Sequence, residues 1–90
     1  MRLINIGYGS LITAERVLSI LEPDSAPIKR VVQEARERGM LIDASYGRKT
    51  KAVILMDTDH VILSALTPDI ISGRWADKIV EGRQEDEELE

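Results

Sequence analysis

Apolar residues fall into short runs along the chain, and the spacing within each run predicts which element it forms. Residues 3–6 are apolar except for Asn5 and lead into a glycine-containing stretch at residues 7–10. This pattern predicts a strand that enters a hairpin or a bulge. Residues 11–21 are ambiguous, because a helical stripe of leucine and alanine overlaps a stretch rich in strand-forming residues. We favour a strand there, since a helix would need about three turns before Pro23.

The helical pattern that follows has signals at both ends. Ser25 is suited to the N-cap, and Pro27 stands in the first turn, where its missing N–H costs little. One face then carries apolar residues at helical spacing, namely Ile28, Val31, Val32 and Ala35. Gly39 is suited to the left-handed conformation that closes a last turn. We therefore expect a helix over residues 26–38, with its mixed-charge outer face in solvent.

Three further strand-like segments follow in quick succession. They are residues 40–46, 52–56 and 61–65. Their short links predict an antiparallel meander, in which residues 47–51 form a hairpin-sized loop. The second link, from Asp57 to His60, is a polar turn of the kind that Asp side chains stabilise by bonding their own backbone. Thr67 and Pro68 are then suited to the N-cap and the first position of a second helix.

These elements predict an α+β fold, a small antiparallel β-sheet domain with one central helix and a C-terminal helix. We expect a single domain over residues 1–83 and a disordered acidic tail over residues 84–90. A chain of 90 residues without Phe or Cys has a thin aliphatic core and no disulfide to support it. We therefore expect association between copies to supply the missing stability.

The net charge of −4 hides two parts of opposite sign. Residues 1–51 contain nine basic and six acidic residues, whereas residues 52–90 contain three basic and ten acidic ones. Five of these acids stand in residues 84–90, so the total understates the basic character of the rest and does not exclude nucleic-acid binding. The sequence shows neither a secretory signal nor the roughly 20 consecutive apolar residues of a membrane span. We expect a cytoplasmic protein with no membrane partner.

Residues that could support catalysis or hold a metal are few. His60 is the only histidine and lies beside Asp57 and Asp59, which would allow a general-base or metal-binding role. We favour a turn-stabilising or exposed histidine, because the spacing matches neither a zinc site nor an EF-hand loop. Residues 7–9 begin like a phosphate-binding turn but lack its third glycine. We expect no catalytic residue, no cofactor, no metal and no small-molecule substrate.

A basic cluster is the strongest functional signal. Arg48, Lys49 and Lys51 stand within four residues at the tip of the predicted hairpin. Lysine contributes mainly phosphate contact, whereas Arg48 can also bind a guanine edge or enter a narrow minor groove. Lysines on exposed hairpins also serve simply to blunt sheet edges and maintain solubility. The cluster alone leaves both interpretations open.

Arg16 is a fourth candidate, in a largely apolar and small-residue segment. An ion pair with Glu15 or Glu22 is its ordinary explanation. Three or four phosphate contacts from one copy would be too few for tight binding at physiological salt. Repetition of the same cations around an oligomer would multiply them.

Four unusual strings in the sequence carry a resemblance to a known family. They are Ile4 to Gly9, Pro23 to Arg30, Gln33 to Ala44 and Met56 to Ala65. In this order they closely resemble the RemA family, the extracellular-matrix regulatory proteins of bacteria. The resemblance implies a nucleoid-associated transcriptional regulator that binds DNA, activates biofilm matrix genes and assembles into closed homo-oligomeric rings. It also implies a subunit similar to the β-rich DNA-binding domain of LytTR regulators.

The resemblance also implies site residues. By position, the DNA-contacting arginine near the N-terminus corresponds to Arg16, and the basic loop pair corresponds to Arg48 and Lys49. The second of that pair is commonly arginine in the family. Lysine keeps the charge but not the planar fork, so we expect phosphate contact rather than base contact at Lys49. Lys51 matches a further basic position, and the implied partners are double-stranded DNA and other copies of the chain.

Two other functions remain open. An RNA-binding module would also use a basic β surface, but it should stack unpaired bases on aromatic side chains, of which only Tyr8, Tyr46 and Trp75 are present. A structural or adaptor protein would use the same cations to bind acidic proteins or its own acidic tail. DNA binding is the function that we favour.

Overall fold

The computed structural model describes the backbone of residues 2–81 and the side chains of residues 2–74. In chain order its elements are β1 (Leu3–Asn5), β2 (Leu11–Thr13), a 3-10 turn (Ala14–Arg16), β3 (Val17–Leu21), α1 (Ala26–Glu37), β4 (Leu41–Asp43), β5 (Ala52–Met56), β6 (Val61–Ser64) and α2 (Pro68–Glu81). The fold class is α+β, as the sequence predicts. The acidic tail expected at residues 84–90 lies outside the described residues. Over residues 2–81, no helix is both long and apolar enough to cross a bilayer.

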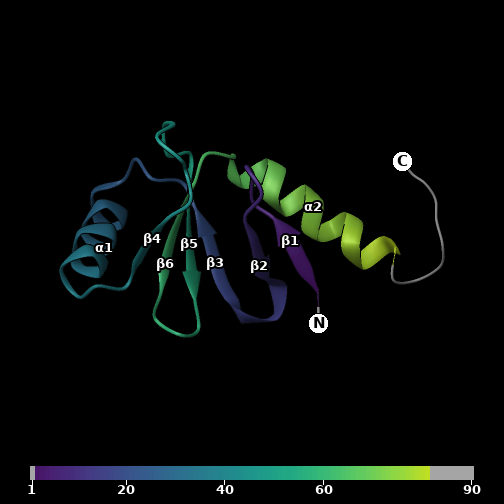
Figure 1. Ribbon diagram of the computed structural model, residues 1–90, viewed down its shortest axis with the longest axis horizontal. Coiled ribbons are helices and arrows are strands. Elements are labelled where there is room, and N and C mark those ends of the chain that lie inside the picture. Colours follow the sequence, from purple (N-terminus) through teal and green to yellow (C-terminus); the bar gives the residue numbers. More distant parts are fainter. Residues whose placement is uncertain (1, 82–90) are drawn as a thin grey trace.

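The strands form two sheets. β1 and β2 pair as an antiparallel hairpin, and the other four strands form a sheet in the order β3-β5-β6-β4. α1 lies on one side of the four-stranded sheet, and the hairpin and α2 lie on the other (Figure 1). Arg74 of α2 donates from Nη1 to the carbonyl oxygen of Asn5 at 2.6 Å, which ties this helix to the hairpin.

The two central strands, β5 and β6, are apolar on both faces. The side chains that pack toward α1 are Val53, Leu55, Val61 and Leu63. Those that pack toward the hairpin and α2 are Ala52, Ile54, Met56 and Ile62. Because successive side chains of a strand point to opposite faces, such a continuous apolar run is stable only with cover on both sides. The two halves of the core therefore meet at β5 and β6.

The antiparallel meander expected from the short links is confirmed for β5 and β6, which pair antiparallel, and is wrong for β4. β4 pairs in parallel with β6, Leu41 opposite Val61, and it does not pair with β5. The run of residues 40–46 supplies only a three-residue strand whose last two residues are exposed. Such a strand is suited to the edge of the sheet, whereas β5 needs neighbours on both sides. Residues 44–51 therefore pass from the sheet edge to β5 as a crossover and are not the tip of a hairpin.

The predicted helix ends are confirmed. Ser25 Oγ accepts from the Ile28 N–H at 3.4 Å at the start of α1, and Gly39 follows that helix with a left-handed φ of 72°. Thr67 Oγ1 accepts from the Ile70 N–H at 3.3 Å at the start of α2.

The segment before α1 is strand, as expected, with one interruption. The Ala14–Arg16 turn divides residues 11–21 into β2 and β3. The hairpin predicted after the first strand is also confirmed, and its turn is closed by the Ile6 N–H, which donates to the carbonyl oxygen of Ser10 at 2.9 Å. All three residues between these two have a positive φ, 107° at Gly7, 54° at Tyr8 and 83° at Gly9.

Gly7 should be the least replaceable residue of this turn. A Cβ built there would lie 3.1 Å from Leu66 Cγ, and its φ is one that L residues rarely adopt. We expect Gly7→Ala to lower the free energy of unfolding by about 1–3 kcal/mol, measured by urea denaturation. Gly9→Ala is the matched control, since it has a positive φ but no atom within 4 Å of its Cβ. Gly9→Ala should lower the free energy of unfolding only by the backbone strain, about 1 kcal/mol. Equal losses of stability in the two variants would show that the contact with Leu66 adds nothing to the cost at Gly7.

Candidate nucleic-acid interface

The crossover from β4 to β5 begins with a turn built by Asp43. Its carboxylate accepts hydrogen bonds from the Ser45 hydroxyl and, at 2.9 Å, from the Ser45 N–H. Both bonds favour the charged form of the carboxylate and hold the pKa of Asp43 below its usual range. The bond from the Ser45 hydroxyl makes the larger contribution, followed by the bond from the Ser45 N–H. Tyr46 and Gly47 follow with left-handed φ values of 54° and 80°, and the Arg48 N–H donates to the Ser45 carbonyl oxygen at 3.1 Å. A hydrogen-bonded turn therefore precedes the basic residues and fixes the direction in which the chain enters them.

The crossover packs against the turn between β1 and β2. The ring centroids of Tyr8 and Tyr46 are 6.3 Å apart, with the rings tilted by 56°. Tyr46 Oη lies 3.2 Å from Ser10 Oγ, and Arg48 Cζ lies 4.6 Å from the centroid of the Tyr8 ring. Residues 7–10 and 44–51 therefore form one continuous surface, which we call the crossover surface.

Three cations are exposed on the crossover surface, namely Arg48, Lys49 and Lys51. The Lys51 N–H donates to the Ser64 carbonyl oxygen at 2.8 Å, which fixes this end of the crossover to β6. Among residues 2–74, no carboxylate lies within ion-pair distance of any of the three cations. Their charges can therefore act on anions, and exposed lysines and arginines of this kind neutralise phosphates.

Arg16 forms an exposed ion pair with Asp57. Its Nη1 lies 3.5 Å from Asp57 Oδ1, and the Asp57 N–H donates to the Arg16 carbonyl oxygen at 2.8 Å. Glu15 instead forms an ion pair with Arg2, whose Nε lies 3.3 Å from Glu15 Oε2. The pKa of Glu15 is lowered, mainly by the hydrogen bond that its carboxylate accepts from the Arg2 backbone N–H. Arg16 therefore has an ion-pair partner, as its ordinary explanation requires, but this partner is neither Glu15 nor Glu22. The Arg16–Asp57 pair is open to solvent and adds only about 0.2–1 kcal/mol, so the arginine can exchange Asp57 for another anion.

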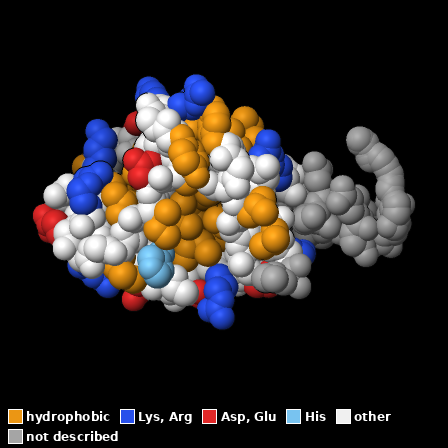
Figure 2. All heavy atoms as spheres, viewed as in Figure 1, with side chains coloured by type: hydrophobic (Ala, Val, Ile, Leu, Met, Phe, Trp, Pro, Cys, Tyr) orange, Lys and Arg blue, Asp and Glu red, His pale blue; other side chains and the backbone are white. Residues whose placement is uncertain are grey.

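Arg16 and the crossover surface lie at opposite ends of β5. Arg16 contacts Asp57, which follows the last residue of the strand, whereas Lys51 precedes the first. A five-residue strand separates its ends by about 13 Å. Figure 2 shows Lys and Arg side chains around the rim of this face of the molecule, with apolar side chains toward its middle. One copy of the chain thus carries the candidate cations as two separate groups.

Leu18 is the most exposed of the large apolar residues with described side chains, at 68%. Val17 pairs with Met56 and Ser19 pairs with Leu55, so Leu18 is the extra residue of a β-bulge in β3. A bulge turns its residue away from the regular alternation of the strand. The alternation of apolar and polar residues does not reveal bulges, and sequence reasoning missed this residue for that reason.

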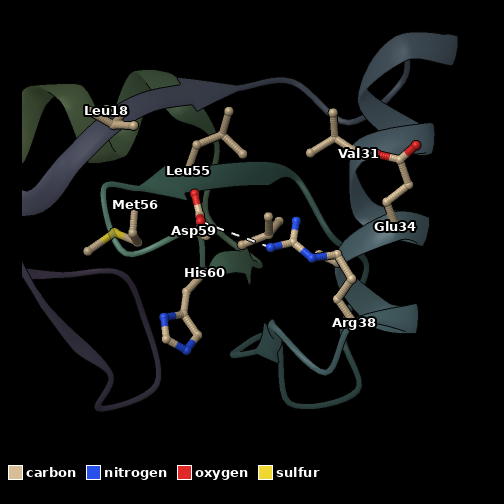
Figure 3. Close-up of a pocket in the computed structure, with 10 residues that line it drawn as sticks. Leu18, Val31, Glu34, Arg38, Leu55, Met56, Asp59 and His60 are labelled. Atoms are coloured by element: carbon tan, nitrogen blue, oxygen red, sulfur yellow. Dashed lines mark ion pairs between the residues drawn. The ribbon is translucent and has the colours of Figure 1, made fainter.

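An open groove of about 200 Å³ runs beside Leu18, between α1 and β5 (Figure 3). Val31 and Leu55 line its apolar part. The ion pair of Arg38 Nη2 with Asp59 Oδ2, at 4.0 Å, lies across it. Together with Leu18, the groove leaves an apolar face in solvent. Faces of this kind are suited to contact with another polypeptide.

His60 lies at the rim of this groove, and its ring points away from the Arg38–Asp59 pair (Figure 3). Its Nδ1 is 2.8 Å from Thr58 Oγ1, within the turn that joins β5 to β6. This bond confirms the turn-stabilising interpretation of His60. In the part of the chain that the structure describes, no three His, Asp or Glu residues are close enough together to hold a metal ion.

Comparison with known proteins adds a family and several relatives. Residues 3–75 match the family model named RemA-like and described as extracellular matrix regulatory protein A-like. A protein of Acetivibrio thermocellus is 54% identical over 90 residues, which are 100% of this chain and 97% of that protein. A protein of Clostridium botulinum is 58% identical over 81 residues, or 90% of this chain and 89% of the relative.

A third relative, from Bacillus pumilus, is 59% identical over 78 residues, which are 87% of this chain and 88% of the relative. All three are provisionally named regulatory proteins, which supports a regulatory role for this one. The matched region contains β1 to β6, the crossover surface and Arg16. This chain therefore belongs to the RemA-like family.

Proposed function

We propose that this protein is a DNA-binding transcriptional regulator, not an enzyme, and that it activates extracellular-matrix genes of a biofilm. The crossover surface is the observation that carries the proposal. Its three exposed cations have no carboxylate partner within residues 2–74, and their loop is held by contacts with Ser10 on one side and Ser64 on the other. Exposed cations on a loop whose backbone is held at both sides can meet the phosphates along duplex DNA.

The three cations have different roles in this proposal. The planar guanidinium of Arg48 can bind a guanine edge or enter a narrow minor groove, whereas Lys49 and Lys51 neutralise phosphates. Each neutralised phosphate makes the logarithm of the binding constant fall by about 0.9 per unit of log salt. A few such contacts from one copy give weak, salt-sensitive binding. Tight binding then requires several copies on one duplex.

We also propose that copies join head to tail into a closed ring, since heterologous contacts that do not close form filaments instead. The separation of Arg16 from the crossover surface supports this proposal, because a ring would repeat both groups at regular intervals. The apolar groove and Leu18 offer a face for the contact. DNA would then meet many weak sites at once. In this proposal the subunit is similar to the LytTR DNA-binding domain, and the ring acts on the nucleoid in the cytoplasm.

RNA is the second candidate partner, and the two tyrosines favour it. Tyr8 is 51% exposed and Tyr46 is 64% exposed, so unpaired bases could stack on them. Against this, Arg48 already lies over the Tyr8 ring and reduces the area open to a base. The adaptor alternative depends in part on residues 84–90, which lie outside the described residues.

Removing either arginine should weaken duplex binding. We expect Arg48→Ala and Arg16→Ala each to raise the dissociation constant roughly five- to hundredfold, measured by fluorescence anisotropy on a labelled duplex. The salt slope should fall by about 0.9 for each phosphate that the variant no longer neutralises. Arg30→Ala, which removes an exposed arginine of α1, is the matched control and should leave both quantities unchanged. Unchanged binding by Arg48→Ala would rule out DNA recognition through the crossover surface.

Competition tests the choice of nucleic acid. Unlabelled duplex DNA should displace the labelled duplex at a lower nucleotide concentration than single-stranded RNA of the same length does. The physical reason is the density of phosphates along a duplex, which brings more phosphates within reach of the cations. If the RNA were the better competitor, the crossover surface would have to be assigned to base stacking.

A charge at Leu18 should break the contact between copies. We expect the wild-type chain to show the mass of an oligomer in light scattering and Leu18→Glu to show a lower mass, because the contact would have to bury the new carboxylate. Leu18→Met keeps an apolar side chain of similar volume and should retain the wild-type mass. A monomeric wild type, or an unchanged mass for Leu18→Glu, would contradict the proposed ring contact.

A further inference from the structure

The crossover surface contains a contact that the sequence does not reveal, the stacking of Arg48 on Tyr8. We propose that Tyr8 is a positioning residue of the DNA interface, which holds the Arg48 guanidinium in the orientation that DNA meets. Arg48 Cζ lies 4.6 Å from the centroid of the Tyr8 ring, within the range of a cation–π contact. The inference rests on the proposed function and adds to it a residue that carries no charge.

The backbone around Tyr8 is built to hold the ring in place. Tyr8 has a φ of 54°, between Gly7 and Gly9, and the Gly7 N–H donates to Asn5 Oδ1 at 2.7 Å. The Ser10 N–H donates to the Gly7 carbonyl oxygen at 3.0 Å, so both sides of the turn are fixed. Glycine or asparagine adopts a left-handed φ with less strain than tyrosine. Tyrosine at such a position indicates a use for its ring.

Tyr46 completes the contact from the other loop. It too has a φ of 54°, and its hydroxyl lies 3.2 Å from Ser10 Oγ. Its ring lies 6.3 Å from that of Tyr8, at the tilt of 56° that aromatic pairs commonly adopt. The sequence has only two tyrosines, and both lie on this surface. Tyr8 is part of the hairpin turn, and Tyr46 stands two residues before Arg48. The two rings thus join the hairpin turn to the basic crossover.

Stacking changes what Arg48 can offer to DNA. In this proposal the guanidinium lies flat over the ring, which uses one of its faces and leaves the N–H edge free for a phosphate or a guanine. The side chain also has fewer rotamers to lose on binding, so ordering it costs less affinity. Lys49 and Lys51 have no planar group and cannot gain in this way. Arg48 is therefore the cation on this surface whose position depends on an aromatic neighbour.

A double-mutant cycle on the full chain tests the positioning role. We expect Tyr8→Leu to weaken duplex binding about two- to fivefold, which corresponds to the loss of an exposed cation–π interaction. Tyr8→Phe keeps the ring face and should bind within about twofold of wild type. In the Arg48→Ala background, Tyr8→Leu should have no further effect, because Tyr8 acts through Arg48. Effects that add would overturn the proposal and show that Tyr8 contacts the nucleic acid itself.

The matched control is a second cycle with Lys49, which has no planar group to stack on the Tyr8 ring. Tyr8→Leu and Lys49→Ala should add. The melting temperature of each variant is measured alongside. If the role of Tyr8 were merely structural, Tyr8→Leu would lower the melting temperature and would change duplex binding to the same extent in both cycles. Tyr8→Phe would then not restore binding. This result too would overturn the proposal.

A spectroscopic measurement separates this inference from the proposed function. In the free protein, the ring current of Tyr8 should shift the side-chain protons of Arg48 upfield, in wild type and in Tyr8→Phe but not in Tyr8→Leu. Unshifted wild-type protons would overturn the stacking whatever the chain binds. Shifted protons together with wild-type DNA affinity for Arg48→Ala would instead sink the proposed function, and with it the role assigned to Tyr8.

Discussion

The structure depends on one constraint, the burial of β5 and β6 on both faces. Every residue of these two strands is buried except Leu55, which is partly buried, so neither strand can lie at an edge or turn a face to water. This places α1 on one side of the sheet and the β1–β2 hairpin with α2 on the other. β3 and the short, half-exposed β4 then take the edges. Because β4 precedes β5 in the chain, the chain must pass from an edge to the centre, and this passage is the segment that carries the basic residues.

The same constraint explains why one copy does not gather its cations. The crossover enters β5 at Ala52, and the turn after Met56 leaves it at the opposite end, where Arg16 lies against Asp57. A buried strand of five residues separates the two groups and cannot bend to join them. The family assignment supports regulation, and the placement of the cations is what links it to DNA in our proposal. The apolar face beside Leu18 is the feature that makes an assembly of copies a reasonable way to combine both groups.

Local sequence signals predicted the elements well and their arrangement poorly. Ser25, Gly39 and Thr67 marked helix ends through capping chemistry, which involves residues three or four positions apart. Strand alternation shows how deeply a strand is buried but not which strand is its neighbour, so the parallel pairing of β4 with β6 was out of reach. The basic cluster could be found as a string, but its contact with Tyr8 joins residues 40 positions apart and leaves no local pattern. The Arg16–Asp57 pair, 41 positions apart, was missed for the same reason, and the bulge at Leu18 was missed because alternation does not reveal bulges.

The parallel pairing of β4 also sets an order on folding. β5 and β6 are joined by a short turn and can pair as soon as both are present, whereas β4 must remain unpaired until β6 has formed, some 20 residues further along the chain. The β4–β6 pairing anchors the first end of the crossover, where the Ala44 N–H donates to the Leu63 carbonyl oxygen, whereas the Lys51 N–H anchors the other end to Ser64 beside the β5–β6 pair. A partly folded chain therefore has the same basic residues without their arrangement. In our proposal, the arrangement of cations that DNA meets is therefore complete only after β4 has paired with β6.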